Sequence, residues 1–72
     1  MSKGSKFTVE IEQETDGRWI AEVQELSGVL CYGASREEAL AKAEALALRV
    51  VADQLETGEK VSKLTSIAFS LA

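Results

Sequence analysis

The chain has 72 residues, of which 46% are hydrophobic and 28% are charged, and it contains no proline and no histidine. This length predicts one small domain and excludes a large enzyme core. A single cysteine without histidine excludes an internal disulfide, zinc fingers and histidine-dependent catalytic groups. We therefore expect no metal ion and no cofactor, and we expect a domain this small to be reinforced by oligomerisation or by a partner.

The balance of charge limits the classes of partner that this chain is expected to bind. The formal net charge is −4 at pH 7 and the sequence pI is about 4.7, so direct binding of nucleic acid is not expected. Between Glu10 and Glu38 there are eight acidic residues but only two arginines. This segment is suited to a basic partner, and the alternative is that its carboxylates are the ordinary solvated groups of a small acidic protein.

Residues 1–6 are polar and predict a flexible N-terminal tail, followed by one domain over residues 7–72. The apolar stretches are interrupted by charges well before the roughly 18 residues that a membrane helix requires, so no membrane association is expected. A lone cysteine agrees with a reducing compartment, and the predicted location is the cytoplasm.

Three strands are predicted before the single helix. Apolar and polar residues alternate over residues 7–12, and Asp16-Gly17 is typical of a tight turn. Residues 19–23 form the expected return strand, with Trp19, Ala21 and Val23 on one face and Ile20 and Glu22 on the other. A loop at residues 26–28 leads to a short strand over 29–32, which Gly33 ends.

Capping residues predict where the helix begins and ends. Ser35 is a typical N-cap, and Glu38 three residues later completes a capping box in which its carboxylate reaches the Ser35 amide. The helix extends from Arg36 to about Glu56, Gly58 is a typical stop, and a last strand follows over residues 65–71. The predicted class is α+β, in the order β-β-β-α-β, with a four-stranded mainly antiparallel sheet and one long helix packed on one face.

The helix carries apolar residues on two sides. One stripe is predicted to lie on the sheet and consists of Ala39, Leu40, Ala43, Leu46, Ala47, Val50 and Val51. A second, which we call the helix stripe, consists of Ala41, Ala45, Leu48, Ala52 and Leu55. The helix stripe is a candidate interface for a homo-oligomer, either a dimer or a tetramer. The alternative is that these alanines are simply good helix formers beside exposed leucines.

Four sequence segments, together with the spacing between them, are similar to those of a known protein family. They are a strand that ends in acids, an Asp-Gly turn followed by an aromatic residue, an acid-Leu-x-Gly loop and a Gly-x-Ser-x-Glu-Glu-Ala helix start. In this chain they read Phe7-Thr8-Val9-Glu10-Ile11-Glu12, Asp16-Gly17-Arg18-Trp19-Ile20-Ala21-Glu22-Val23, Glu25-Leu26-Ser27-Gly28 and Gly33-Ala34-Ser35-Arg36-Glu37-Glu38-Ala39. Together they resemble the HicB-like antitoxin family, and Ser27 stands where the family's loop has a proline.

The resemblance implies a partial ribonuclease-H-like fold without that fold's catalytic carboxylates. It also implies a partner, a small basic ribonuclease of the HicA-like toxin type, and no DNA-binding segment is matched in this chain. The candidate toxin-binding residues are Glu10, Glu12, Glu22 and Glu25. An enzyme is not expected, because metal-dependent hydrolysis needs several converging carboxylates and the last strand has none. Structural roles are expected for Leu26, Gly28, Trp19 and Cys31 as core and turn residues.

Overall fold

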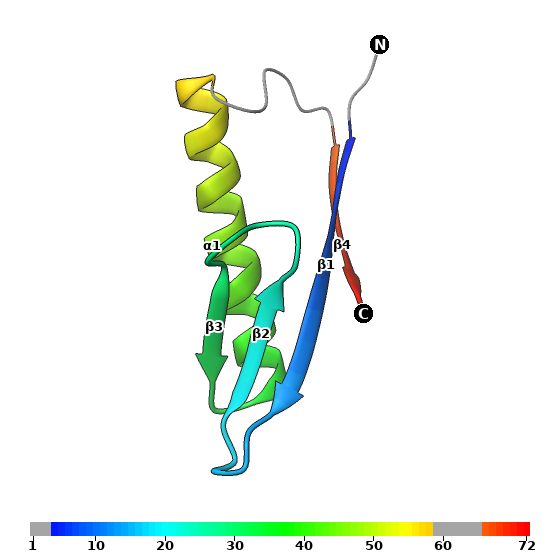
Figure 1. Cartoon of the computed structure of the whole chain (residues 1–72), viewed down its shortest axis with the longest axis vertical. Coiled ribbons are helices and arrows are strands. Elements are labelled where there is room, and N and C mark those ends of the chain that lie inside the picture. The colour runs from blue at the N-terminus through cyan, green and yellow to red at the C-terminus, as the bar shows by residue number, and fades with distance from the viewer. Residues whose placement is uncertain (1–3, 59–65) are drawn as a thin grey trace.

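The computed structural model describes residues 4–58 and 66–72, and it confirms the predicted β-β-β-α-β order (Figure 1). The predicted beginning of the last strand at Thr65 lies outside the described residues, as do residues 1–3. The elements are β1 (Gly4–Gln13), β2 (Trp19–Val23), β3 (Leu30–Gly33), α1 (Arg36–Thr57) and β4 (Ser66–Leu71).

The four strands form one mixed sheet in the order β3-β2-β1-β4. β2 pairs antiparallel with both of its neighbours, whereas β4 pairs parallel with β1. The long β1 is divided between two partners, because its first half pairs with β4 and its second half pairs with β2 (Figure 1). Pairing of Gly4 with Ser66 extends β1 over residues 4–6, so the strand begins before the predicted start at Phe7.

Capping groups hold both ends of α1. The Ser35 hydroxyl accepts a hydrogen bond from the Glu38 amide at 3.1 Å, which confirms the predicted N-cap. The Glu38 carboxylate accepts from the Ala34 amide, one residue before the predicted Ser35. Gly58 adopts the left-handed conformation at φ 69°, and its amide donates to the Gln54 carbonyl at 2.9 Å. The sequence therefore specifies both boundaries of the helix through local contacts.

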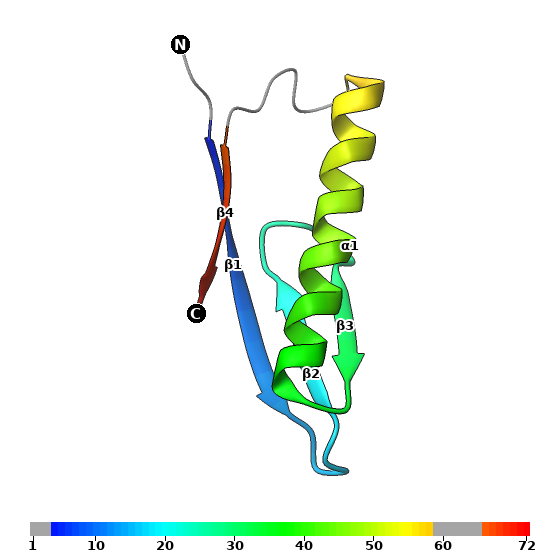
Figure 2. The same ribbon diagram turned by 180° about the vertical axis from the view of Figure 1, so that it is seen from behind.

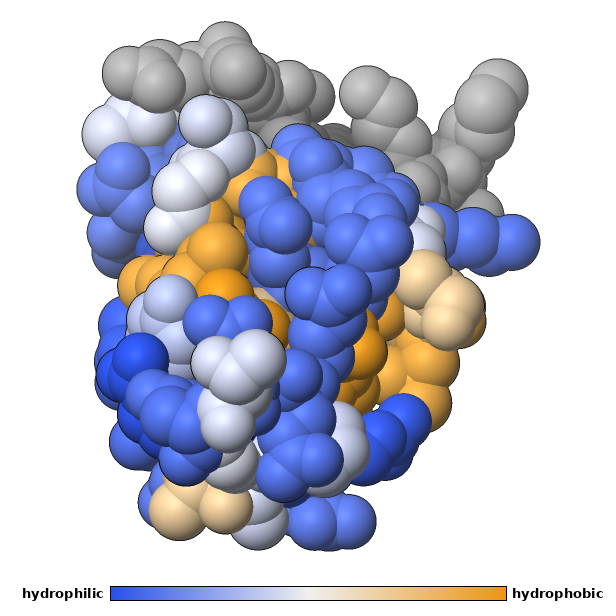
Figure 3. All heavy atoms as spheres, turned by 60° about the horizontal axis from the view of Figure 1, so that its bottom comes forward, coloured by the Kyte–Doolittle hydropathy of each residue, from blue (hydrophilic) through white to orange (hydrophobic). Residues whose placement is uncertain are grey.

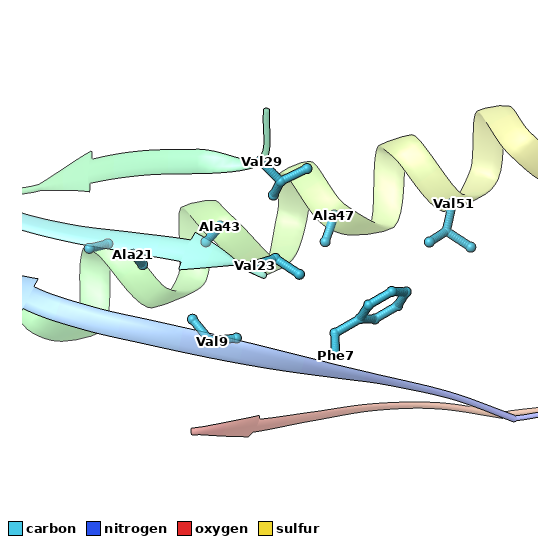
Figure 4. Close-up of a cluster of buried hydrophobic side chains, with 9 residues drawn as sticks. Phe7, Val9, Ala21, Val23, Val29, Ala43, Ala47 and Val51 are labelled. Atoms are coloured by element: carbon cyan, nitrogen blue, oxygen red, sulfur yellow. The ribbon is translucent and has the colours of Figure 1, made fainter. Parts of the chain in front are cut away.

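The helix packs on one face of the sheet, chiefly against β2 and β3 (Figure 2). The predicted stripe is confirmed: its members are either buried or packed partly buried against the core. No side chain larger than valine is completely buried; among the described residues the largest such side chains are Val9, Val23 and Val29. Phe7 points from β1 toward Val51 of the helix (Figure 4). The buried core consists of Phe7, Val9, Ala21, Val23, Val29, Ala39, Ala43, Ala47 and Val51.

The predicted turn and loop residues have the expected structural roles. Gly17 and Gly28 have positive φ angles of 93° and 83°, and Asp16 accepts a hydrogen bond from the Arg18 amide. Trp19, Leu26 and Cys31 pack partly buried against the core, as expected. The described part of the chain contains no helix that is long and apolar enough to cross a bilayer.

Candidate functional site

The candidate site is the face of the sheet that lies opposite α1, which we call the outer face. Even-numbered residues of β1 and β2 project from it, because side chains alternate along a strand. Glu10, Glu12 and Glu22 meet there around a hollow that also includes Ile20. These three carboxylates, which we call the acidic face, come from the two central strands. Figure 3, which brings the end of the molecule with the turn between β1 and β2 forward, shows hydrophilic and hydrophobic residues side by side on the surface.

The strand register brings like charges together on this face. Glu10 is the cross-strand partner of Glu22, and Glu12 is the partner of Ile20. Directly opposed carboxylates repel each other, which disfavours the pairing of the two strands. Among residues 4–58 and 66–72 the one ion pair is Arg18 with Asp16 at 2.8 Å, so it leaves the acidic face without a neutralising cation.

We therefore expect Glu22→Gln to stabilise the fold. The change removes one of two facing charges while keeping the length of the side chain, and it should raise the free energy of unfolding by about 0.5 kcal/mol at low salt. Urea denaturation at low and high ionic strength measures the gain, which salt should reduce by screening the original repulsion. The control is Glu44→Gln, in the middle of α1 and away from both helix ends. Equal effects of the two changes, or a loss in Glu22→Gln, would contradict cross-strand repulsion.

Glu25, the fourth candidate residue, has a different local role. Its carboxylate accepts one hydrogen bond from the Thr8 amide at 2.7 Å and another from the Thr8 hydroxyl at 2.8 Å. These bonds hold the loop after β2 against β1, just beyond the last paired residues of the two strands. The structure thus places Glu25 apart from the hollow that the acidic face lines. Its contact with Thr8 crosses 17 residues of sequence, so no local pattern indicated it.

The same contact makes stability depend on pH. The Thr8 amide and hydroxyl hold the pKa of Glu25 below its ordinary value of 4.5, and the Arg18 amide is the main cause that lowers the pKa of Asp16 from 3.8. A carboxyl group whose pKa is lowered by folding stabilises the folded state at pH values above its ordinary pKa. This stabilisation is lost as the pH falls through the folded-state pKa. We therefore expect stability to decline below about pH 4.5.

Urea denaturation of Glu25→Gln from pH 7 to pH 3 tests this expectation, since the variant retains an acceptor but cannot ionise. The variant should be less stable than the wild type at neutral pH, and the difference should shrink in acid. Thr8→Val, which removes only the hydroxyl donor, should give a smaller change of the same sign. A difference that stays constant with pH would show that the Glu25 contact does not depend on charge.

Apolar side chains continue the outer face toward the edge strand β3. Leu30 is 40% exposed and Tyr32 is 41% exposed, and both pair with residues of the site: Leu30 with Glu22, and Tyr32 with Ile20. The Arg18 guanidinium lies over the Tyr32 ring, 4.5 Å from its centroid, in a cation–π contact. We call Ile20, Leu30 and Tyr32 the apolar half of the outer face.

The hollow itself suits a protein contact better than a small ligand. Its volume is about 60 Å³, whereas pockets for small molecules enclose roughly 300–1,000 Å³. Within the described ranges, no group of three or more Cys, Asp or Glu side chains is arranged to hold a metal ion. The arrangement can therefore attract cations electrostatically and offer apolar area to a flat or convex surface.

The helix stripe lies away from this site and is largely open to solvent. Leu48 is 46% exposed and Leu55 is 37% exposed, whereas Ala45 is half-buried. Ala41 and Ala52 are exposed. These residues are thus accessible to a second protein chain. Comparisons of the chain with protein-family models, with curated proteins and with solved structures find no match.

Proposed function

We propose that this chain is a non-catalytic protein-binding module of the HicB-like antitoxin kind, which acts in the cytoplasm on a small basic ribonuclease toxin. The observation that carries the proposal is the convergence of Glu10, Glu12 and Glu22 on a sheet face that no described element covers. The resemblance of four sequence segments to the HicB-like family adds support. The proposed inhibition is steric and electrostatic, because the acidic face would occupy a basic surface that binds RNA.

Charge reversal tests this proposal. The chain is used to capture proteins from its native cells at low salt, and intact-mass analysis identifies what elutes. We expect a stoichiometric small basic protein that cleaves RNA, that raised salt releases, and that the captured complex holds inactive. The triple variant Glu10→Lys, Glu12→Lys and Glu22→Lys should bind it at least about tenfold more weakly.

A matched control separates surface position from net charge. Reversal of three exposed acids of α1, with Glu37→Lys, Asp53→Lys and Glu56→Lys, changes the total charge by the same amount. Binding should survive in this variant. Equal binding by the wild type and both triple variants would refute the assignment of the acidic face, and recovery of a partner without ribonuclease activity would refute the antitoxin role.

The alternative function is a homo-oligomeric structural or regulatory module without a toxin partner. Exposure of Leu48 and Leu55 on one side of α1 favours it, because contiguous exposed apolar residues are typical of interfaces. Under this alternative, Leu48→Glu and Ala45→Glu should convert an oligomer to monomers in sedimentation experiments. A hydrodynamic mass that does not change in these variants would exclude the helix stripe as the interface.

A further inference from the structure

The acidic face and the apolar half form one continuous surface with two rows. The register places Tyr32, Ile20 and Glu12 in one row across β3, β2 and β1, and it places Leu30, Glu22 and Glu10 in the next. Apolar character therefore lies toward the β3 edge and negative charge toward β1. Neighbouring strands are about 4.8 Å apart, so the carboxylates on β1 and the apolar side chains on β3 are separated by two strand spacings, roughly 10 Å.

We propose that this surface docks a basic amphipathic helix of the partner, aligned along the strands, with its cationic flank over β1 and its apolar flank over β3. The inference rests on the proposed function and specifies which part of the partner is bound and how. A helix with its side chains is about 10–12 Å wide, which matches the three strands β1 to β3. Helix residues four apart are separated by about 6 Å, which matches the roughly 7 Å between Glu10 and Glu12 on one strand.

Charge complementarity selects this occupant and its orientation. The β1 side presents Glu10 and Glu12, with Glu22 beside them, and the Arg18 ion pair with Asp16 lies outside this group. Arg18 itself covers Tyr32 and places positive charge at the β3 side near the hairpin. Asp16 offsets this charge, so the carboxylates on the β1 side are what orients the partner's cationic flank. Lys6, on the same face of β1, is four residues from Glu10, about 13 Å along the strand.

Exposed apolar groups beside the charges provide the part of the contact that salt does not screen. Leu30 and Tyr32 are each about two-fifths exposed, and Ile20 between them is half-buried. Binding energy in protein interfaces is concentrated in a few aromatic and apolar residues, whereas charged groups at the rim mainly set orientation and association rate. Tyr32 and Leu30 are thus the anchors, and the acidic face aligns the helix.

The test uses the full chain and a synthetic helical peptide with lysines at positions i, i+4 and i+8 and leucines at i+3 and i+7. Backbone amide NMR signals should shift for residues of the outer face, with little change in α1. Affinity is measured by calorimetry at low and at high salt. A control peptide of the same composition, with its lysines and leucines dispersed around the helix, should bind at least fivefold more weakly.

Variants of the chain separate the two kinds of contact. Leu30→Thr and Tyr32→Thr keep β propensity and should weaken binding at least fivefold at both salt concentrations. Glu12→Gln should weaken binding mainly at low salt. Leu48→Thr, which changes a leucine of α1 that is at least as exposed as Leu30, should bind as the wild type does.

The outcomes distinguish this inference from the function on which it rests. If Glu12→Gln weakens binding but Leu30→Thr and Tyr32→Thr do not, the amphipathic docking mode is wrong and a purely electrostatic contact remains. If the peptide shifts the signals of α1 instead, or binds every variant equally, the outer face is not the docking surface. The proposed function would be refuted as well if the outer face is not the docking surface and the charge-reversed chain captures the natural partner as well as the wild type does.

Discussion

Gly33→Ala should lower the free energy of unfolding by about 3 kcal/mol, although alanine is an ordinary residue at the end of a strand. A Cβ at this position would lie 2.9 Å from the Cα of Ala39 and even closer to the Ala39 amide nitrogen. These are backbone atoms of the first turns of α1, so they cannot move aside as the end of a flexible side chain can. The helix and β3 must separate to admit one methyl group.

The measurement is urea denaturation, in which the midpoint should fall while the slope is unchanged. Gly28→Ala is the matched control, because a Cβ there meets no atom within 4 Å but the φ of 83° is unfavourable for alanine. The control should cost about 1 kcal/mol through backbone strain alone. A loss in Gly33→Ala no larger than that of the control would contradict close contact between α1 and β3.

Ala43→Leu should also destabilise the domain by about 3 kcal/mol. Ala39, Ala43 and Ala47 are completely buried at four-residue spacing, where small side chains let the helix approach the sheet closely. A leucine at the middle position adds three carbon atoms to a contact that has room for a methyl group. Val9 and Val23 belong to the same buried cluster as Ala43, and their packing against α1 would be lost as the helix is displaced.

Ala41→Leu provides the comparison for this second prediction. It makes the same substitution in the same helix at an exposed position, and alanine and leucine have similar helix propensities, so stability should change by less than about 0.5 kcal/mol. Thermal unfolding followed by circular dichroism measures both variants. Similar midpoints for the two would show that the buried alanines do not set the distance between helix and sheet.

Local features of the fold were accessible from the sequence. Alternation predicted β2 with its observed bounds, and the Ser35 and Gly58 caps predicted α1 to within one residue, because these signals act between near neighbours. The third strand begins at Leu30 instead of the predicted Val29, which the loop uses for a hydrogen bond to Leu26. The parallel pairing of β1 with β4 could not be derived, because it joins segments that are distant in sequence.

The candidate site was likewise predictable from the sequence only in its local features. A period of two placed Glu10 and Glu12 on one face, and the hairpin made Glu22 their neighbour. Three features depend on tertiary register instead: the contact of Glu25 with Thr8, the Arg18 position over Tyr32, and the junction of the acidic face with the apolar half. The sequence also places opposite charges four residues apart on α1, Glu38 with Lys42 and Arg49 with Asp53, but neither pair forms an ion pair within the described ranges. Glu38 is used by the N-cap instead.

The division of β1 between two partners also bears on the order of folding. The hairpin with β2 forms between adjacent segments, whereas β4 can join only after the intervening helix has been synthesised and the chain closes on itself. Leu71 lies on the helix side of β4 but is 52% exposed, because α1 packs elsewhere on the sheet. Ile67 and Phe69 of β4 are only partly buried against the core. We therefore expect β4 to form last and to exchange its amide hydrogens first, while the outer face of β2 and β3 stays intact.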